Sequence, residues 1–247
     1  MAKTTAETGV ATADGGSPRT RPWLLELYGS AVGKKYAMAL SGIVLMVYVL
    51  LHMVGNLKLY FGPGAMQEYA DWLRIFGAPA VPDSVTLWAV RIVLLVAFVV
   101  HIHAAVVLTL MNRRAWPERY QSKRDYLAAD FAARTMRWSG VIVLLFVLFH
   151  LADLTFGYAN PDFQGHGDVY HNVVASFSRP LVGAFYILAN LALGLHLYHG
   201  AWSLFQTMGW NRPRFNHWRR WFAIAFAVVV AGGNISFPIA VMSGVVS

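Results

Sequence analysis

The sequence predicts an all-α membrane protein, a bundle of five transmembrane helices. Of the 247 residues, 57% are hydrophobic and only 13% are charged, whereas soluble domains carry about 25% charged residues. The apolar residues also gather in five runs, and a bilayer span needs about 20 such residues. A soluble fold of this composition would leave many apolar side chains exposed to water.

The five runs give the expected spans and leave short segments between them. The spans cover approximately residues 36–57, 88–111, 138–158, 180–205 and 221–245. Residues 1–20 are expected to form a disordered tail, and residues 21–247 one transmembrane domain without a repeat of fixed period. Short helices are expected within 22–33, at the membrane interface, and within 61–84, capping the outer end. Pro238 is expected to loosen the last span.

Basic residues alternate along the chain and predict its orientation. Of the 20 Lys and Arg residues, 16 lie in the N-terminal region, the second-to-third connection and the fourth-to-fifth connection. The positive-inside rule then places the N-terminus in the cytoplasm and the C-terminus outside, as for a multi-pass protein of the bacterial cytoplasmic membrane. Because these charges flank apolar runs, lipid headgroups are their expected partners and nucleic acid is not.

Histidines lie inside the apolar spans at two depths. Ionisable residues in a membrane are costly and point to function, although a single buried histidine is more often an interhelical hydrogen bond. At about 1.5 Å per residue, His52 and His150 lie roughly 10–12 Å below the outer ends of their spans, and His101 and His196 lie roughly 15–24 Å deep. The six histidines within the spans are His52, His101, His103, His150, His196 and His199.

Two imidazoles on different helices at one depth can clamp a haem iron from both faces. Such a pair leaves no open coordination position, which favours electron transfer over oxygen chemistry. The chain has no cysteine, which excludes thiolate metal sites and c-type haem attachment. Geometry leaves His103 open as an alternative to His101, and His199 as an alternative to His196. The spare histidines are candidates for haem propionates or another secondary contact.

Small residues in the spans have two interpretations. They can make room for a macrocycle between the helices, or they can allow ordinary close packing of helices. The residues concerned are Gly42, Gly55, Gly140, Gly183 and Gly194.

At its histidine-bearing spans the sequence resembles the single-chain dihaem cytochrome b anchors of succinate dehydrogenases and fumarate reductases. The resemblance covers roughly residues 30–245. It is carried by KKYAMALSGIVLMVYVLLHMVGNL in the first span, HIHAAVVLTLMNRRAWPERY from the second, GVIVLLFVLFHL in the third and HLYHGAWSLFQTMGW in the fourth. By this resemblance two haem b groups lie between the first four helices, held by His52 with His150 and by His101 with His196.

The resemblance also implies a role in succinate:quinone oxidoreductase, the respiratory complex II. An iron–sulfur subunit and a flavoprotein subunit would bind at the cytoplasmic face, and the chain would pass electrons to menaquinone or ubiquinone. The succinate site would lie on another subunit, and the complex could form a higher oligomer. Candidate quinone or proton-carrying residues near the outer end are Glu68, Asp71 and Asp153.

Two rival functions fit parts of the pattern. The chain could be the quinone-linked cytochrome b of a formate dehydrogenase or hydrogenase, which the copurifying subunits would reveal. It could also be a haem-free transporter that uses its histidines as a proton relay. A visible spectrum of the purified protein separates that second rival from both cytochromes.

Overall fold

A computed structural model describes residues 22–115, 130–210, 212 and 216–247. This part of the chain is helical and holds no β-strand, and it contains five helices that are long and apolar enough to cross a membrane. The predicted tail at 1–20 lies outside the described residues. The long helices are α2 (Ala31–Asn56), α4 (Val85–Ala115), α5 (Asp130–His150), α7 (Pro180–Thr207) and α8 (Asn216–Met242). The predicted all-α, five-helix membrane bundle is therefore confirmed.

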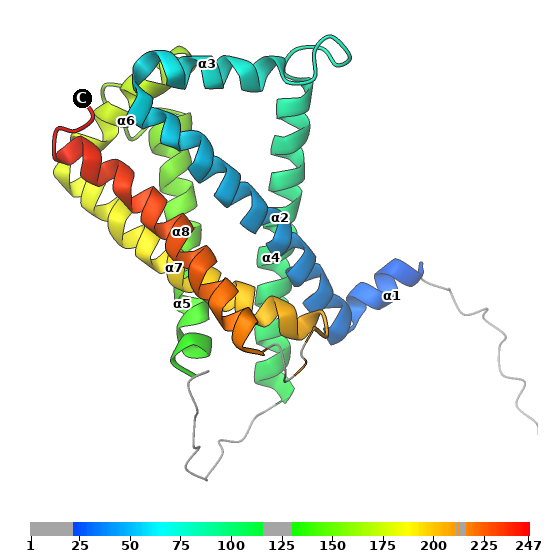
Figure 1. Ribbon diagram of the computed structural model, residues 1–247. Helices are drawn as coiled ribbons and strands as arrows, with labels where there is room; N and C mark the ends of the chain where they lie inside the picture. Colours follow the sequence, from blue (N-terminus) through cyan, green and yellow to red (C-terminus); the bar gives the residue numbers. More distant parts are fainter. Residues whose placement is uncertain (1–21, 116–129, 211, 213–215) are drawn as a thin grey trace, which may run out of the picture.

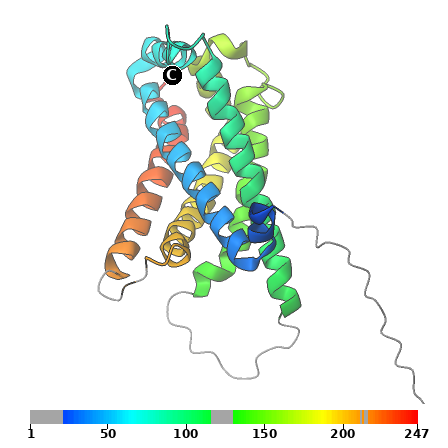
Figure 2. The same cartoon turned by 90° about the vertical axis from the view of Figure 1, so that its right-hand side faces the viewer.

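The long helices form two pairs and a flanking helix. Helix α2 packs against α4, α5 packs against α7, and α8 lies along α7. Figures 1 and 2 show that α7 and α8 run side by side, whereas α2 crosses α4. The end at which α2 and α8 begin is called the basic end here, because arginines and lysines gather there. The basic residues at this end whose side chains the structure describes are Lys34, Lys35, Arg113, Arg114, Arg137, Arg212, Arg219 and Arg220.

The opposite end, called the capped end, is closed by short elements that lie across the bundle. A 3₁₀ turn, η1 (Leu57–Phe61), continues α2 and leads into α3 (Gly62–Ile75), which runs across this end in Figure 1. Gly62 has a φ of 88°, a backbone conformation that glycine adopts without steric cost, and it turns the chain there. Helix α6 (Val169–Phe177) and the C-terminus lie at the same end.

The remaining short elements flank the bundle at both ends. At the basic end α1 (Trp23–Gly29) precedes α2, and Ser30 caps α2 by accepting a hydrogen bond from the backbone of Gly33 at 2.9 Å. At the capped end a π-helical turn, η2 (Leu151–Thr155), extends α5, and η3 (Gly165–Gly167) precedes α6. The short helices expected within 22–33 and 61–84 are thus present as α1 and α3.

The bundle exposes apolar side chains along its long helices, as lipid contact requires. One such residue on each long helix is more than half exposed: Leu40, Leu95, Leu145, Leu188 and Val228. Water would make this surface unfavourable, whereas acyl chains cover it without cost. The protein is therefore a multi-pass membrane protein.

Helix α8 packs closely on α7 and is not interrupted. A Cβ atom added at Gly194 would lie 2.9 Å from the Cβ of Ala231, and one at Gly183 would lie 2.8 Å from the sulfur of Met242. These two glycines therefore serve helix packing. Pro238 is buried, and α8 passes through it without a break, because the neighbouring helix supports the backbone around it.

Candidate functional site: two histidine pairs between helical hairpins

The basic-side pair consists of one histidine from α4 and one from α7. The ring centres of His101 and His196 lie 6.4 Å apart, with the ring planes at 72°. Helices α2 and α4 form one helical hairpin, and α5 and α7 form the other. One ring comes from each hairpin, and the two rings meet in the space between the hairpins. Both side chains are partly buried.

Each ring of the basic-side pair is held by the partner helix of its own hairpin. The Nδ1 atom of His101 lies 3.1 Å from the carbonyl oxygen of Met38 and 3.3 Å from the hydroxyl of Ser41. Because a carbonyl oxygen only accepts, Nδ1 carries the proton and Nε2 keeps a free lone pair. Ser41 donates its own proton to Ala37 O at 2.7 Å, so its oxygen is the second acceptor for the imidazole.

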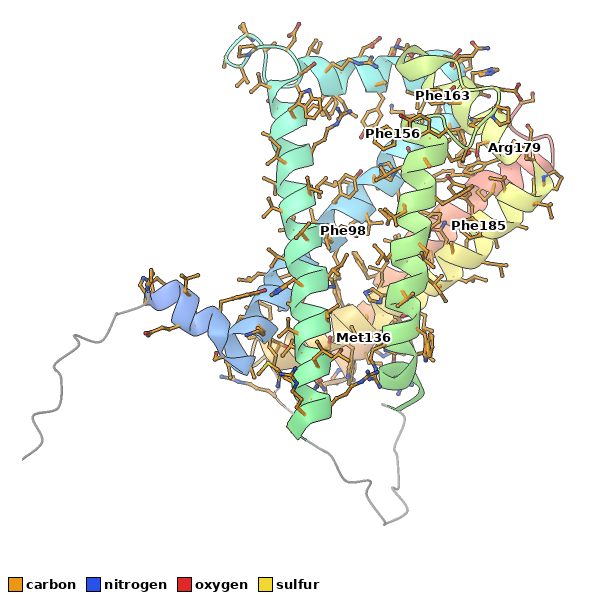
Figure 3. The ribbon with its side chains drawn as sticks, turned by 180° about the vertical axis from the view of Figure 1, so that it is seen from behind. Phe98, Met136, Phe156, Phe163, Arg179 and Phe185 are labelled. Carbon is orange, nitrogen blue, oxygen red and sulfur yellow. The ribbon has the colours of Figure 1, made fainter. Side chains whose placement is uncertain are left out.

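His196 is likewise supported by a serine of α5. Its Nδ1 lies 3.3 Å from the hydroxyl of Ser139, which donates its own proton to the carbonyl oxygen of Met136 at 3.0 Å. Figure 3 places Met136 on α5 toward the basic end. The two imidazoles therefore have matching supports on two different helices, and each is oriented with Nε2 as its available ligand atom.

Glycines follow the two serines and leave room for the rings. A Cβ atom added at Gly42 would lie 3.4 Å from Cε1 of His101, and one at Gly140 would lie 3.4 Å from Cε1 of His196. A third glycine, Gly55, instead faces the ring of Tyr69 on α3. Of the five glycines singled out in the sequence, only Gly42 and Gly140 adjoin the histidine rings.

These supports reveal a short motif shared by α2 and α5 that a search for fixed-period repeats misses. The same offset along the chain separates Met38 from Met136, Ser41 from Ser139, Gly42 from Gly140 and His52 from His150. The shared pattern begins Met-x-x-Ser-Gly and ends in histidine on α2 and on α5. Sequence reasoning passed over both serines, and aligning the first and third spans with each other would have found them.

The capped-side pair joins α2 to α5. The ring centres of His52 and His150 lie 5.9 Å apart, with the planes at 87°. Tyr48, one turn before His52 on α2, stacks on its ring with centres 5.4 Å apart. The two levels predicted from depth therefore correspond to two ring pairs in the structure, one between α2 and α5 and one between α4 and α7.

A buried polar network connects His150 to the capped end. Nδ1 of His150 lies 3.4 Å from the hydroxyl of Tyr186, which donates to Oδ2 of Asp153 at 2.9 Å. Asp153 is 0% exposed and forms an ion pair with Arg179 at 2.6 Å. Ser176 also donates a hydrogen bond to Asp153. Figure 3 shows Arg179 at the capped end of α7.

This network gives Asp153 a defined place. The residue lies in the π-helical turn η2 directly after His150, and such turns are frequent at functional sites. Its carboxylate is shared among Arg179, Tyr186 and Ser176 rather than directed at a cavity. Sequence reasoning named Asp153 but missed Tyr186 and Arg179, because nothing in the sequence places α7 beside η2.

The other two candidate acids lie on α3. Glu68 is exposed, and Asp71 accepts hydrogen bonds from Gln67 and pairs with Arg74 at 2.5 Å. Both side chains are outside the space between the hairpins. Their predicted part in quinone or proton chemistry stays a prediction.

The two spare histidines take different places. His103 is exposed on α4, and its Nδ1 lies 2.5 Å from the hydroxyl of Tyr28 on α1. His199 is only 6% exposed, and its Nε2 has no hydrogen-bond partner in the described part of the chain. The structure therefore brings His101, and not His103, to the ring of His196.

A cavity of about 150 Å³ adjoins the capped-side pair. Its walls include His52 and His150, together with Asn56 from α2 and Asn172 from α6. Phe163, labelled in Figure 3, closes part of it from the segment before α6. The cavity gives a small apolar molecule with polar ends access to the rings from the capped end.

The side chains alone do not complete a metal centre at either level. Groups of three or more His, Cys, Asp or Glu residues that could hold a metal ion are absent from residues 22–115, 130–210, 212 and 216–247. A metal bound by either pair would take its remaining ligands from a non-protein group. No protein-family model, curated protein or solved structure matches the chain.

Proposed function

We propose that the chain is a dihaem cytochrome b that anchors a succinate:quinone oxidoreductase in the membrane. Two haem b groups would lie between the hairpins, one held by His52 and His150 and the other by His101 and His196. The observation that carries the proposal is the meeting of two histidine pairs, each from opposite hairpins, at two levels of one bundle.

The spacing of the rings supports this ligand assignment. Metal–imidazole bonds are about 2.0–2.1 Å long, so two rings that ligate one metal atom from opposite sides have centres about 6 Å apart. The observed separations are 5.9 Å and 6.4 Å.

The surroundings of the rings suit a porphyrin as the remaining ligand. The protons of His101 and His196 lie on Nδ1, which leaves Nε2 for iron. Gly42 and Gly140 keep the flanking helices clear of the rings. Bound haem supplies one-electron chemistry, and two imidazole ligands leave no position for oxygen.

The orientation of the chain gives the proposed path a direction. By the positive-inside rule the basic end would lie in the cytoplasm, where an iron–sulfur subunit and its flavoprotein would dock. Electrons would enter at the basic-side level and leave at the capped-side level. The host membrane in this proposal is the bacterial cytoplasmic membrane.

Quinone would be reduced beside the capped-side pair. The cavity of about 150 Å³ between His52, His150 and Asn172 supports this placement. Its amide and imidazole groups can hydrogen-bond quinone oxygens. Glu68 and Asp71 on α3 are the predicted proton carriers toward the aqueous phase. Asp153 would act on His150 through Tyr186.

Counting haems in histidine variants tests the proposal. We expect two low-spin haems per chain in the wild-type protein and one in each single variant His52→Ala, His101→Ala, His150→Ala and His196→Ala. The matched controls His103→Ala and His199→Ala should keep both haems. A protein purified without a visible haem spectrum after haem supplementation would contradict the proposal and favour the haem-free transporter.

Double variants test the pairing. His52→Ala combined with His150→Ala removes two ligands of one level, so one haem should remain. His52→Ala combined with His101→Ala removes a ligand from each level, so no haem should remain. Equal losses in the two double variants would contradict the assigned pairs.

Copurification tests the complex. We expect the native complex to contain a flavoprotein and an iron–sulfur protein and to reduce quinone with succinate. Copurification with a molybdenum- or nickel-containing dehydrogenase would instead identify the rival formate dehydrogenase or hydrogenase cytochrome. That result would leave the two haem sites intact and overturn only the choice of complex.

A further inference from the structure

A second cavity lies at the basic end, away from both histidine pairs. It has a volume of about 560 Å³ and lies between the last turns of α7 and the first turns of α8. Four aromatic residues and two arginines form most of its wall: Phe205, Trp210, Trp218, Phe222, Arg212 and Arg219. The proposed haem and quinone sites use none of these residues.

Arg219 is a buried cation that has no ion pair with any of the described residues. It is only 6% exposed, and its guanidinium carbon lies 4.8 Å from the centre of the Trp202 ring. Its Nε and Nη1 atoms have no hydrogen-bond partner among the described residues. Burial of a charge is costly unless the charge is paired, so this guanidinium is suited to an anion from outside the chain.

None of the described residues that line the cavity is an acid. Residues 169–247, which include α7 and α8, contain no Asp or Glu. Arg212 adds a second positive charge to the same cavity wall. The site therefore carries two cations and requires an anionic group of small size, such as a phosphate.

The remaining walls indicate that the anion belongs to an amphipathic molecule. Trp210, Trp218 and Phe222 are 59%, 65% and 46% exposed, and tryptophans at the end of a span lie at headgroup depth. Below them α8 exposes Val228 and Val229 along its outer face. An acyl chain can follow this surface while its phosphate reaches the arginines.

We propose that this cavity binds the phosphate of an anionic phospholipid, with Arg219 and Arg212 on the headgroup and the aromatic residues around the glycerol region. Basic pockets between transmembrane helices bind anionic lipid headgroups in this manner. Charge-assisted hydrogen bonds from arginine to phosphate provide the selectivity over lipids without net charge.

The test measures lipid retention by the full chain. The detergent-purified protein is mixed with phosphatidylglycerol or phosphatidylcholine, and bound lipid is counted by native mass spectrometry. We expect one phosphatidylglycerol to be held about tenfold more tightly than phosphatidylcholine. Arg219→Gln should abolish this preference. Arg220→Gln, an exposed neighbour outside the cavity wall, should keep it.

Each other outcome bears on the proposal. Equal retention of both lipids by the wild-type protein would overturn it, even if Arg219→Gln fails to fold. Displacement of phosphatidylglycerol by millimolar inorganic phosphate would show a free-phosphate site instead. A preference that persists in Arg219→Gln, or that Arg220→Gln removes equally, would show a general surface charge effect and overturn the site.

Discussion

The basic-side and capped-side histidine pairs use the same four helices, but different groups support them. A serine hydroxyl supports each of His101 and His196, and His101 also contacts the carbonyl oxygen of Met38. His150 instead contacts Tyr186, which leads to the buried ion pair of Asp153 and Arg179. One level is therefore supported by neutral dipoles and the other by charges.

The difference shows how two helices that share one motif can contribute to two unequal sites. The Met-x-x-Ser-Gly pattern of α2 and α5 supports histidines of α4 and α7, so the basic-side level is nearly symmetric. At the capped end α2 leads into α3 and α5 leads into η2, and the symmetry ends there. If both pairs hold haem, the charges of the capped side set a difference in reduction potential.

The largest expected effect is on the stability of the protein when the ion pair beside the capped-side histidines is broken. Arg179→Ala leaves the carboxylate of Asp153 buried without its cation, and loss of one partner of a buried pair costs about 3–5 kcal/mol. Thermal unfolding in detergent measures this loss. The matched control is Arg74→Ala, whose exposed pair with Asp71 should contribute at most about 1 kcal/mol. Similar losses in both variants would contradict the buried role of Arg179.

Replacing a glycine beside the rings with a larger residue should disturb the basic-side pair alone. Gly42→Leu pushes a branched side chain against His101, and overpacking of this kind costs about 1–3 kcal/mol. We expect the basic-side haem to be lost while the capped-side haem remains, as measured by haem content and spectrum. Gly42→Ala should keep both, since its Cβ would lie 3.4 Å from the ring. If Gly42→Leu lost the capped-side haem instead, the assignment of Gly42 to the basic-side pair would be wrong.

Neutralising the acid should shift one potential. Asp153→Asn removes a negative charge that reaches His150 through Tyr186. A unit charge at about 10 Å and an effective dielectric constant near 20 is worth about 1.7 kcal/mol. If the capped-side pair holds a haem, its potential should rise by about 70 mV, because the carboxylate favours the oxidised haem. Redox titration followed in the visible spectrum measures both haems, and the basic-side potential should not move.

The smallest effect concerns the serines. Ser41→Ala removes one of two acceptors from Nδ1 of His101 and leaves Met38 O. A hydrogen bond contributes about 0.5–1.5 kcal/mol, and the remaining acceptor offsets part of it. We expect the basic-side potential to rise by about 20 mV, and Ser139→Ala to act equally. A shift in the potential of the capped-side haem instead would contradict the assignment of these serines to the basic-side level.

The sequence was sufficient to predict the helices because the lipid bilayer imposes a simple rule. Every backbone polar group in the bilayer must be paired within its own segment, so long apolar runs become helices wherever they lie in the chain. The five spans, the interfacial helix α1 and the capping helix α3 all follow from composition and length. Helix α8 continues through Pro238, which local propensity does not predict.

The levels of the histidines also follow from the sequence, because depth depends only on the count of residues along a helix. The choice between His101 and His103 does not, since it depends on how α4 is rotated against α7. The structure turns His101 to His196 and leaves His103 beside Tyr28. The rotation of a helix about its axis is set by packing with other helices, so counting residues along one helix cannot predict it.

Composition and spacing by themselves determined that this chain crosses a membrane five times and carries paired histidines at two depths. Only the tertiary structure decided that Gly42 and Gly140 face imidazoles whereas Gly55, Gly183 and Gly194 serve packing. It also joined Asp153 to Arg179 and Tyr186, and it buried Arg219 without an acidic partner among the described residues. The physical reason is that burial and pairing are properties of contacts between helices, and these form only when the whole bundle assembles.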